Sequence, residues 1–270
     1  MTDRDAAPAG RLVLIGVLAG FLSGLFGVGG GVLIVPALVT LCRLDQRQAV
    51  ATSLLAIGPL AVAGVIGYAI HRQVDVFLAV PLIIGTVVGA WIGAALLRRV
   101  SLPVLRLIFA LAALSAGIRL IVDPGVPAGP VHHELWRLAI LVPVGVAVGI
   151  LAGLTGIGGG AVMVPMMELG FAVAAALAKG TSLLVILPTA LLSGWRNLRA
   201  HLGSIHDATW IGLSGVLTVL VASAISVRLP GTVADLLFGF FLSAVALRTV
   251  WPDLRSWRSR SARRSSAGPS

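Results

Sequence analysis

Eight long apolar runs make up most of the chain and constrain its fold more than any other feature. They cover residues 12–42, 48–70, 76–97, 103–122, 138–167, 173–195, 208–227 and 232–251. Most approach the roughly 20 residues that an α-helix needs to cross the hydrocarbon core of a membrane. Transmembrane β-strands would alternate apolar and polar residues in segments of about ten. The runs therefore predict an all-α polytopic membrane protein with about eight transmembrane helices.

The composition also favours a membrane location. Of the 270 residues, 58% are hydrophobic and 11% are charged, and the mean hydropathy is +1.04. A soluble domain carries about 25% charged residues, because its surface meets water. We therefore expect a multi-pass protein of the cell membrane, whose partner over most of its surface is the lipid bilayer.

The net charge of +10 comes almost entirely from arginines that lie between the apolar runs and in the last residues. Loop charges that set membrane orientation explain this pattern better than nucleic-acid binding, so no nucleic-acid partner is expected. With eight crossings, the basic residues divide evenly between the two sides. Only Arg248 and the basic tail then favour cytoplasmic termini.

The two halves of the chain resemble each other. Residues 16–38 and 145–167 are identical at 12 of 23 positions when they are aligned at an offset of 129. The matches are mainly glycine and proline, which chance similarity between apolar segments would not produce. The predicted division is an N-terminal tail (1–10), a first membrane repeat (11–122), a connecting loop (123–136), a second membrane repeat (137–251) and an Arg/Ser-rich tail (252–270), whose composition is typical of disorder.

The first apolar run of each half is too long for one straight helix. The 31 uncharged residues between Arg11 and Arg43 would form a helix of about 46 Å, whereas the hydrocarbon core is about 30 Å thick. Each run has glycines in its middle and a proline five residues later, and these residue types disfavour a continuous helix. We expect a Gly-rich broken first helix in each half, either discontinuous or re-entrant.

Paired helix breaks at equivalent places in two repeats indicate the binding site of a transporter. A helix that resumes after a break presents free N–H groups and the positive end of its dipole, which together bind an anion without a charged side chain. The alternative is close helix packing, which suits the glycines spaced by four, such as Gly16, Gly20 and Gly24. Three successive glycines cover every face of a helix, so the binding-site interpretation is favoured for them.

In the first half, a Gly-x-x-Gly-x-Gly-Gly-Gly motif ends at Gly31 and is followed by Pro36 and the Thr-Ser-Leu-Leu sequence that begins at Thr52. In the second half, the same motif ends at Gly160 and is followed by Pro165 and Thr181. This doubled motif resembles the sulfite exporter TauE/SafE family of membrane permeases. The resemblance covers roughly residues 11–251 and implies a small anion, such as sulfite, a sulfonate or a similar organic anion, as the substrate. The matching positions are Gly27, Gly29, Gly30, Gly31, Pro36, Thr52, Ser53 and Pro59 in the first half, and Gly156, Gly158, Gly159, Gly160, Pro165, Thr181, Ser182 and Pro188 in the second.

Other polar residues near the breaks have two interpretations each. The hydroxyls of Thr52, Ser53, Thr181 and Ser182 either donate to the anion or cap a helix. The only lysine, Lys179, either supplies a cation to the substrate or extends to the membrane interface, and the second interpretation is favoured. Glu168 either accepts a coupling proton or lies in water at a helix end, and the second interpretation is favoured.

The sequence therefore predicts a permease or exporter for a small anion that binds between the two broken helices. A channel-like permease for another small solute and a membrane scaffold without transport activity are the alternatives. With no nucleophile–base pair, nucleotide loop or Cys/His metal spacing, we expect no enzyme and no cofactor. Proton coupling and homo-oligomerisation remain open.

Overall fold

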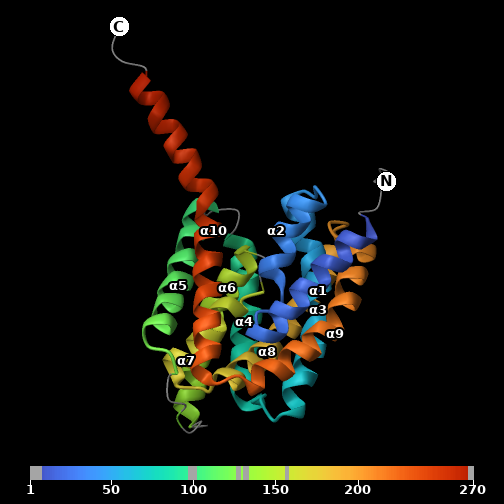
Figure 1. Ribbon diagram of the computed structural model, residues 1–270, viewed down its shortest axis with the longest axis vertical. Coiled ribbons are helices and arrows are strands. Elements are labelled where there is room, and N and C mark those ends of the chain that lie inside the picture. The colour runs from blue at the N-terminus through green and yellow to red at the C-terminus, as the bar shows by residue number, and fades with distance from the viewer. Residues whose placement is uncertain (1–7, 97–101, 126–128, 130–133, 156–157, 267–270) are drawn as a thin grey trace.

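The computed structural model describes residues 8–96, 102–125, 129, 134–155 and 158–266, and all regular structure within them is helical (Figure 1). The helices are α1 (Ala9–Phe26), α2 (Gly31–Leu41), α3 (Gln46–Ile70), α4 (Val76–Leu96), α5 (Leu102–Val122), α6 (Leu135–Thr155), α7 (Gly160–Phe171), α8 (Ala175–Arg199), α9 (Ile205–Arg228) and α10 (Gly231–Ser266). The predicted all-α class is correct for these residues. Within them, six helices are long and apolar enough to cross a membrane, so eight crossings are not established.

The difference between eight runs and ten helices arises where two runs break. The run at 12–42 divides into α1 and α2 at residues 27–30, and the run at 138–167 divides into α6 and α7 before Gly160. Both pairs fold back as hairpins. Arg11 Nη1 donates to Leu41 O at 2.8 Å, which brings the start of α1 to the end of α2. The start of α6 and the end of α7 likewise border one surface hollow.

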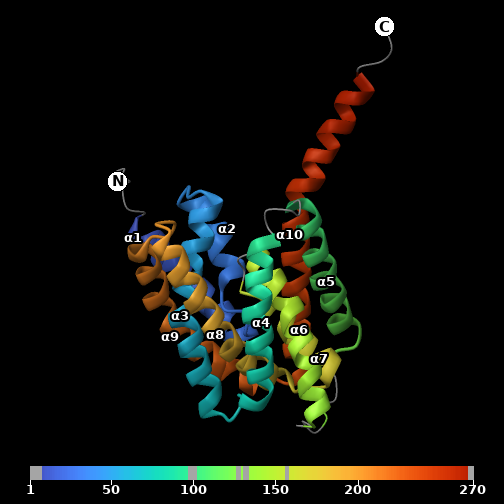
Figure 2. The same ribbon diagram turned by 180° about the vertical axis from the view of Figure 1, so that it is seen from behind.

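The two hairpins point into the molecule from opposite ends. The α1–α2 hairpin begins and ends near the chain's N-terminus, whereas the α6–α7 hairpin begins and ends at the other end (Figures 1 and 2). Helices α2, α3, α4 and α5 begin 129 residues before α7, α8, α9 and α10, respectively. The offset of 129 residues that aligns the sequence motifs of the two halves therefore also aligns the starts of these helices.

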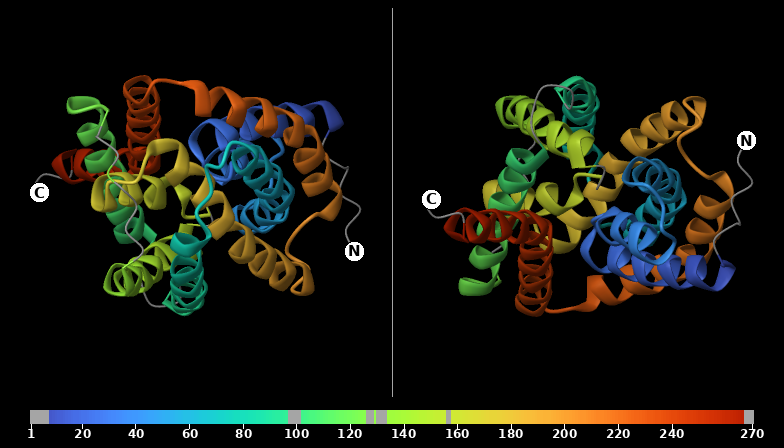
Figure 3. Two further views of the ribbon diagram at one scale, coloured as in Figure 1. Left: turned by 90° about the horizontal axis from the view of Figure 1, so that it is seen from below. Right: turned by 90° about the horizontal axis from the view of Figure 1, so that it is seen from above.

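Helices from different halves lie against each other. Helix α1 packs on α9, α4 packs on α6, and α5 packs on α10 (Figure 3). Glycines make two of these contacts close, as the spacing by four predicted. A Cβ on Gly20 would lie 2.4 Å from Gly215 O of α9, and a Cβ on Gly89 would lie 2.2 Å from Val146 O of α6. The halves therefore interlock through backbone approaches that larger side chains would prevent.

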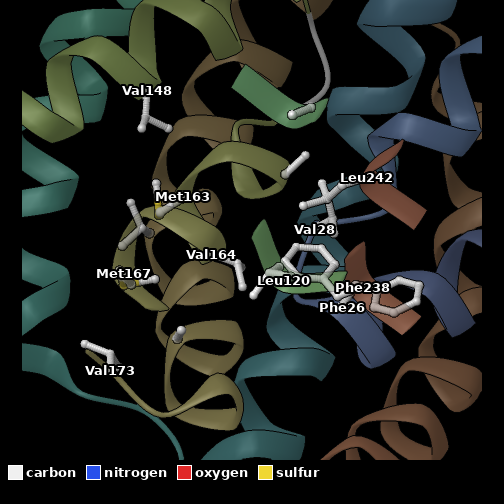
Figure 4. Packing of buried hydrophobic residues seen from close by; sticks show 14 of the residues in the cluster. Phe26, Val28, Leu120, Val148, Met163, Val164, Met167, Val173, Phe238 and Leu242 are labelled. Carbon is white, nitrogen blue, oxygen red and sulfur yellow. The ribbon is translucent and has the colours of Figure 1, made fainter. Parts of the chain in front are cut away.

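The core is apolar and includes the tip of the first hairpin, where α1 ends and the chain turns back into α2. Phe26 stacks on Phe238 and Phe241 of α10, with ring centroids 5.5 and 4.7 Å apart. Figure 4 shows Phe26 and Val28 among Leu120, Phe238 and Leu242, with the side chains of α7 nearby. Large apolar side chains such as Phe77 on α4 and Leu217 on α9 are mainly exposed on the outside, as expected of a surface that faces lipid.

The C-terminal residues differ from the sequence-based expectation. The Arg/Ser-rich segment was expected to be disordered, but α10 continues past Trp251 as one helix to Ser266 and extends beyond the bundle (Figure 1). The segment contains no glycine between Trp251 and Ser266, and arginine and alanine favour helix. Charge composition alone did not reveal this continuation.

Candidate functional site

The tips of the two hairpins form the candidate site, and their glycines have a backbone conformation that other residues rarely adopt. In the first tip, φ is +70° at Gly27, +75° at Gly29 and +78° at Gly30. In the second, φ is +92° at Gly158 and +78° at Gly159, while Gly156 lies outside the described residues. A left-handed conformation costs an ordinary L-residue roughly 1–2 kcal/mol, so the sharp reversal requires glycine.

The two tips meet inside the molecule. A Cβ placed on Gly160 would lie 2.8 Å from both Gly27 O and Val28 Cα. Ile57 of α3 and Ile186 of α8 pack against Gly29 from the two halves. Gly27, Gly29, Gly30 and Gly31 are buried, as are Gly159 and Gly160. The expected helix breaks therefore lie together, in an arrangement that covers their backbone.

Hydroxyl groups satisfy the carbonyls at the end of α1. Tyr68 donates to Gly24 O at 2.7 Å, Ser226 donates to Leu25 O at 2.9 Å, and Ser182 donates to Gly27 O at 2.8 Å. A helix that ends inside a membrane leaves its last carbonyls without partners, and these three bonds remove that penalty. Sequence reasoning missed Tyr68 and Ser226, although Tyr68 is the only tyrosine of the chain.

The N-terminal ends of α2 and α7, unlike the C-terminal end of α1, have no side-chain partner in the described part of the chain. No side chain caps either helix at Gly30 or Gly159. Helical hydrogen bonding begins with Leu33 and Ile34, which donate to Gly30 O, and with the equivalent pair that donates to Gly159 O. The positive ends of two helix dipoles therefore lie at the two tips without a side-chain acceptor among the described residues.

The threonines expected at the site hold loops of the opposite half. The hydroxyl of Thr181 accepts the N–H of Asp75 at 3.0 Å, and that of Thr52 accepts the N–H of Ser204 at 3.1 Å. Asp75 and Ser204 in turn cap the first turns of α4 and α9. Both threonines thus use their oxygen to position a helix start, and neither caps its own helix.

The serines and prolines predicted at the site differ in what they contact. Ser182 contacts Gly27 directly, whereas Ser53 Oγ is buried and has no hydrogen-bond partner among the described residues. Pro36 and Pro165 lie inside α2 and α7, five residues beyond their first glycines. Each proline leaves one carbonyl of the preceding turn without its helical partner.

Two charged residues are buried, contrary to the favoured expectations for them. Lys179 is 1% exposed and does not extend to an interface, and Glu168 is 3% exposed and does not lie in water. The Cα of Lys179 would lie 2.6 Å from a Cβ on Gly27, so this lysine begins directly beside the first tip. Asp235 of α10 is also buried and accepts the N–H of Gly125 at 2.8 Å. The folding-back of α7 brings Glu168 inward, which its place near a helix end did not indicate.

Comparisons with known proteins agree on the class of this chain. The model of the sulfite exporter TauE/SafE family matches residues 2–120 and 141–270. The probable membrane transporter protein YunE of Bacillus subtilis is 31% identical over 223 residues, which cover 74% of this chain and 80% of YunE. The probable membrane transporter protein YdhB of the same organism is 39% identical over 111 residues, covering 41% of this chain and 45% of YdhB.

A third relative, a probable membrane transporter protein of Haemophilus influenzae, is 24% identical over 263 residues, covering 87% of this chain and 95% of the relative. The alignment with YdhB spans under half of that protein's length. No solved structure matches the chain significantly. The relatives and the apolar helices together indicate a multi-pass membrane transporter. Because the family model matches most of both halves, the chain belongs to the sulfite exporter TauE/SafE family.

Proposed function

We propose that this chain transports a small anion, such as sulfite, a sulfonate or a similar organic anion, which binds between the two hairpin tips. The observation that carries the proposal is the meeting of the two tips, at each of which an uncapped helix begins after a left-handed glycine. Such ends bind anions through backbone N–H groups and the helix dipole. Gly24 O, Leu25 O and Gly27 O already have hydroxyl partners, whereas the first N–H groups of α2 have no described side-chain acceptor.

The proposed mechanism is alternating access by two inverted repeats. The tips are buried together, so an anion reaches them only if one hairpin moves away from the other. The hairpins open toward opposite ends of the molecule (Figures 1 and 2), so movement of each hairpin would expose the site to a different side of the membrane. Ser53, with its buried hydroxyl, and Lys179 are the side chains proposed to assist the backbone.

The test is flux of labelled sulfite, a sulfonate and acetate in proteoliposomes that contain wild type, Gly29→Ala or Gly158→Ala. An added Cβ meets its nearest described atoms at 3.4 Å or more in both variants, so their main cost is the positive φ. We expect flux of the transported anion to fall at least tenfold in both. Gly58→Ala is the matched control, because its Cβ would meet only Leu191 at 3.5 Å within helical backbone.

The outcomes separate the candidate functions. Normal flux in both tip variants would contradict a site at the glycines. No flux of any anion from folded wild type would contradict anion transport and favour the non-transporting scaffold, while flux of neutral solutes alone would favour the channel-like permease. Size-exclusion chromatography of each variant in detergent establishes that it is folded.

A further inference from the structure

We propose that Glu168 is a proton-binding site which, together with Lys179, couples the movement of the anion to the movement of a proton. This inference rests on the proposed anion site, because the anion is what displaces the interaction between the two side chains. It adds the coupling ion, and it assigns a role to Glu168, which the proposed anion site does not use.

Glu168 is buried without the partners that an ionised carboxylate requires. It is 3% exposed, and neither of its oxygens has a hydrogen-bond partner among the described residues. A buried carboxylate without such bonds is costly unless a proton or a counter-ion neutralises it. It lies on α7, the helix that begins at the second tip, so movement of that hairpin carries Glu168 with it.

Lys179 supplies the counter-ion. It is 1% exposed, and its Nζ lies 3.4 Å from Ser226 Oγ, whose own hydrogen is donated to Leu25 O. Helix α7, which carries Glu168, packs against α8, which carries Lys179, so the two buried opposite charges lie on adjacent helices without a direct ion pair in the described part of the chain. The backbone of Lys179 lies beside Gly27, and Lys179 is the one buried basic side chain among the described residues.

Other charged and titratable groups around Glu168 are already engaged. Asp235 of α10 accepts a hydrogen bond from Gly125, and Tyr68 of α3 donates its own to Gly24 O. The charged residue of α5 whose side chain is described, Arg119, pairs with exposed Asp123 at 2.6 Å. The described side chains of α6 carry no charge. Lys179 is therefore the group whose interaction with Glu168 an arriving anion changes most.

The proton balance follows from this exchange of partners. Without substrate, the carboxylate of Glu168 neutralises Lys179. When the anion arrives it becomes the counter-ion of Lys179, and Glu168 then takes a proton from the same aqueous side. Anion and proton cross together, and on the far side departure of the anion restores the pair as the proton leaves. The corresponding residues of the first half are Val39 and Val50, so we expect one proton per anion.

The test uses proteoliposomes that contain a pH-sensitive dye and the anion that wild type transports. A gradient of a monovalent anion, such as a sulfonate or acetate, should drive proton movement in the same direction. Because one proton balances the charge of such an anion, an imposed membrane potential should leave wild-type flux unchanged. In Glu168→Gln we expect anion flux that no longer moves protons, with a dye signal at least tenfold smaller, and that now responds to the potential. Glu168→Asp should retain coupling, and so should the control Asp235→Asn, whose amide oxygen can still accept from Gly125.

Several outcomes would overturn the inference. Wild-type anion flux that moves no protons and follows the membrane potential excludes it without any variant. Proton movement retained in Glu168→Gln would also exclude it, while the anion flux itself would leave the proposed function intact. Absence of anion flux in wild type would instead contradict the proposed function, and it differs from the outcomes above because in those the anion still moves. If Glu168→Gln does not fold, wild-type anion flux without proton movement still excludes the inference, and loss of proton movement in a folded Glu168→Ala variant takes the place of the Gln result.

Discussion

Polar side chains inside this protein serve mainly to satisfy backbone groups that the helix breaks expose. Tyr68, Ser182 and Ser226 come from three different helices and converge on the last carbonyls of α1. In lipid, a backbone carbonyl without a partner costs several kcal/mol, because no water reaches it. Residues distant in sequence therefore stabilise the break at the first tip by supplying hydrogen-bond donors.

Tyr68→Phe tests this interpretation at one atom. The change keeps the ring but removes the hydroxyl that donates to Gly24 O, and we expect destabilisation of about 1 kcal/mol. The measurement is the midpoint of thermal unfolding in detergent. Ser115→Ala is the control, since the Ser115 hydroxyl bonds to Ala112 O within its own helix and is exposed. Equal midpoints for wild type and Tyr68→Phe would show that the bond contributes nothing.

The buried charges show why a single residue is difficult to interpret from sequence. Glu168 and Lys179 stand where the first half has Val39 and Val50, and this mismatch between related halves was the available signal. It indicated that the positions differ, but it did not say whether the charges face water or protein. Burial depends on how α7 and α8 pack, which no local pattern records.

Among the helices, small residues decide which pairs approach closely. Gly85, Gly89 and Gly93 of α4 face backbone atoms of α6, and the glycines of α1 face α9. Van der Waals packing drives helix association in lipid, where apolar side chains gain little from contact with each other rather than with lipid. The spacing by four thus identified contact faces correctly, although it could not identify the partner helix.

Gly89→Ala should weaken the contact between α4 and α6. Its Cβ would lie 2.2 Å from Val146 O, so the helices must separate, at a cost of about 1–3 kcal/mol. Gly58→Ala shares the gain of about 0.5–1 kcal/mol in helix propensity, but it meets no such obstacle. We expect a lower thermal midpoint for Gly89→Ala than for Gly58→Ala. The reverse order would show that the two helices do not pack closely at Gly89.

For the whole molecule, the hairpins change the distribution of charge across the membrane. If eight straight helices crossed the membrane, the basic residues would divide evenly between its two sides. The hairpins change this division, because both ends of each hairpin lie at the same end of the molecule. The arginines at the end that holds both termini are Arg11, Arg43, Arg47, Arg196, Arg199 and Arg248, followed by those of the α10 extension, and those at the opposite end are Arg72, Arg119, Arg137 and Arg228. The excess of arginine at the first end predicts that this end is cytoplasmic.

Thiol labelling tests both the orientation and the opposite entry of the hairpins. In a Cys42→Ser background, Gln46→Cys lies beyond the first hairpin and Gly170→Cys near the end of the second, and both positions are exposed. A membrane-impermeant reagent should label Gln46→Cys from the cytoplasmic side and Gly170→Cys from the other side. The Cys42→Ser protein without added cysteine is the control. Labelling of both from one side would contradict the arrangement of the two hairpins.

The sequence by itself determined the class of fold, the family and the position of the helix breaks. These depend on local properties: apolar length, glycine and proline at fixed spacing, and a motif that recurs after 129 residues. A break at three consecutive glycines follows from backbone energetics alone, so it could be located without knowing its surroundings.

Only the tertiary structure decided that each broken run folds back as a hairpin, that the tips of the two hairpins meet, and that Glu168 and Lys179 are buried beside them. A glycine break permits either a continued or a reversed chain with little difference in local energy. Contacts between the halves select the reversed chain, because donors such as Ser182 and close approaches such as that of α4 to α6 are made between residues far apart in sequence.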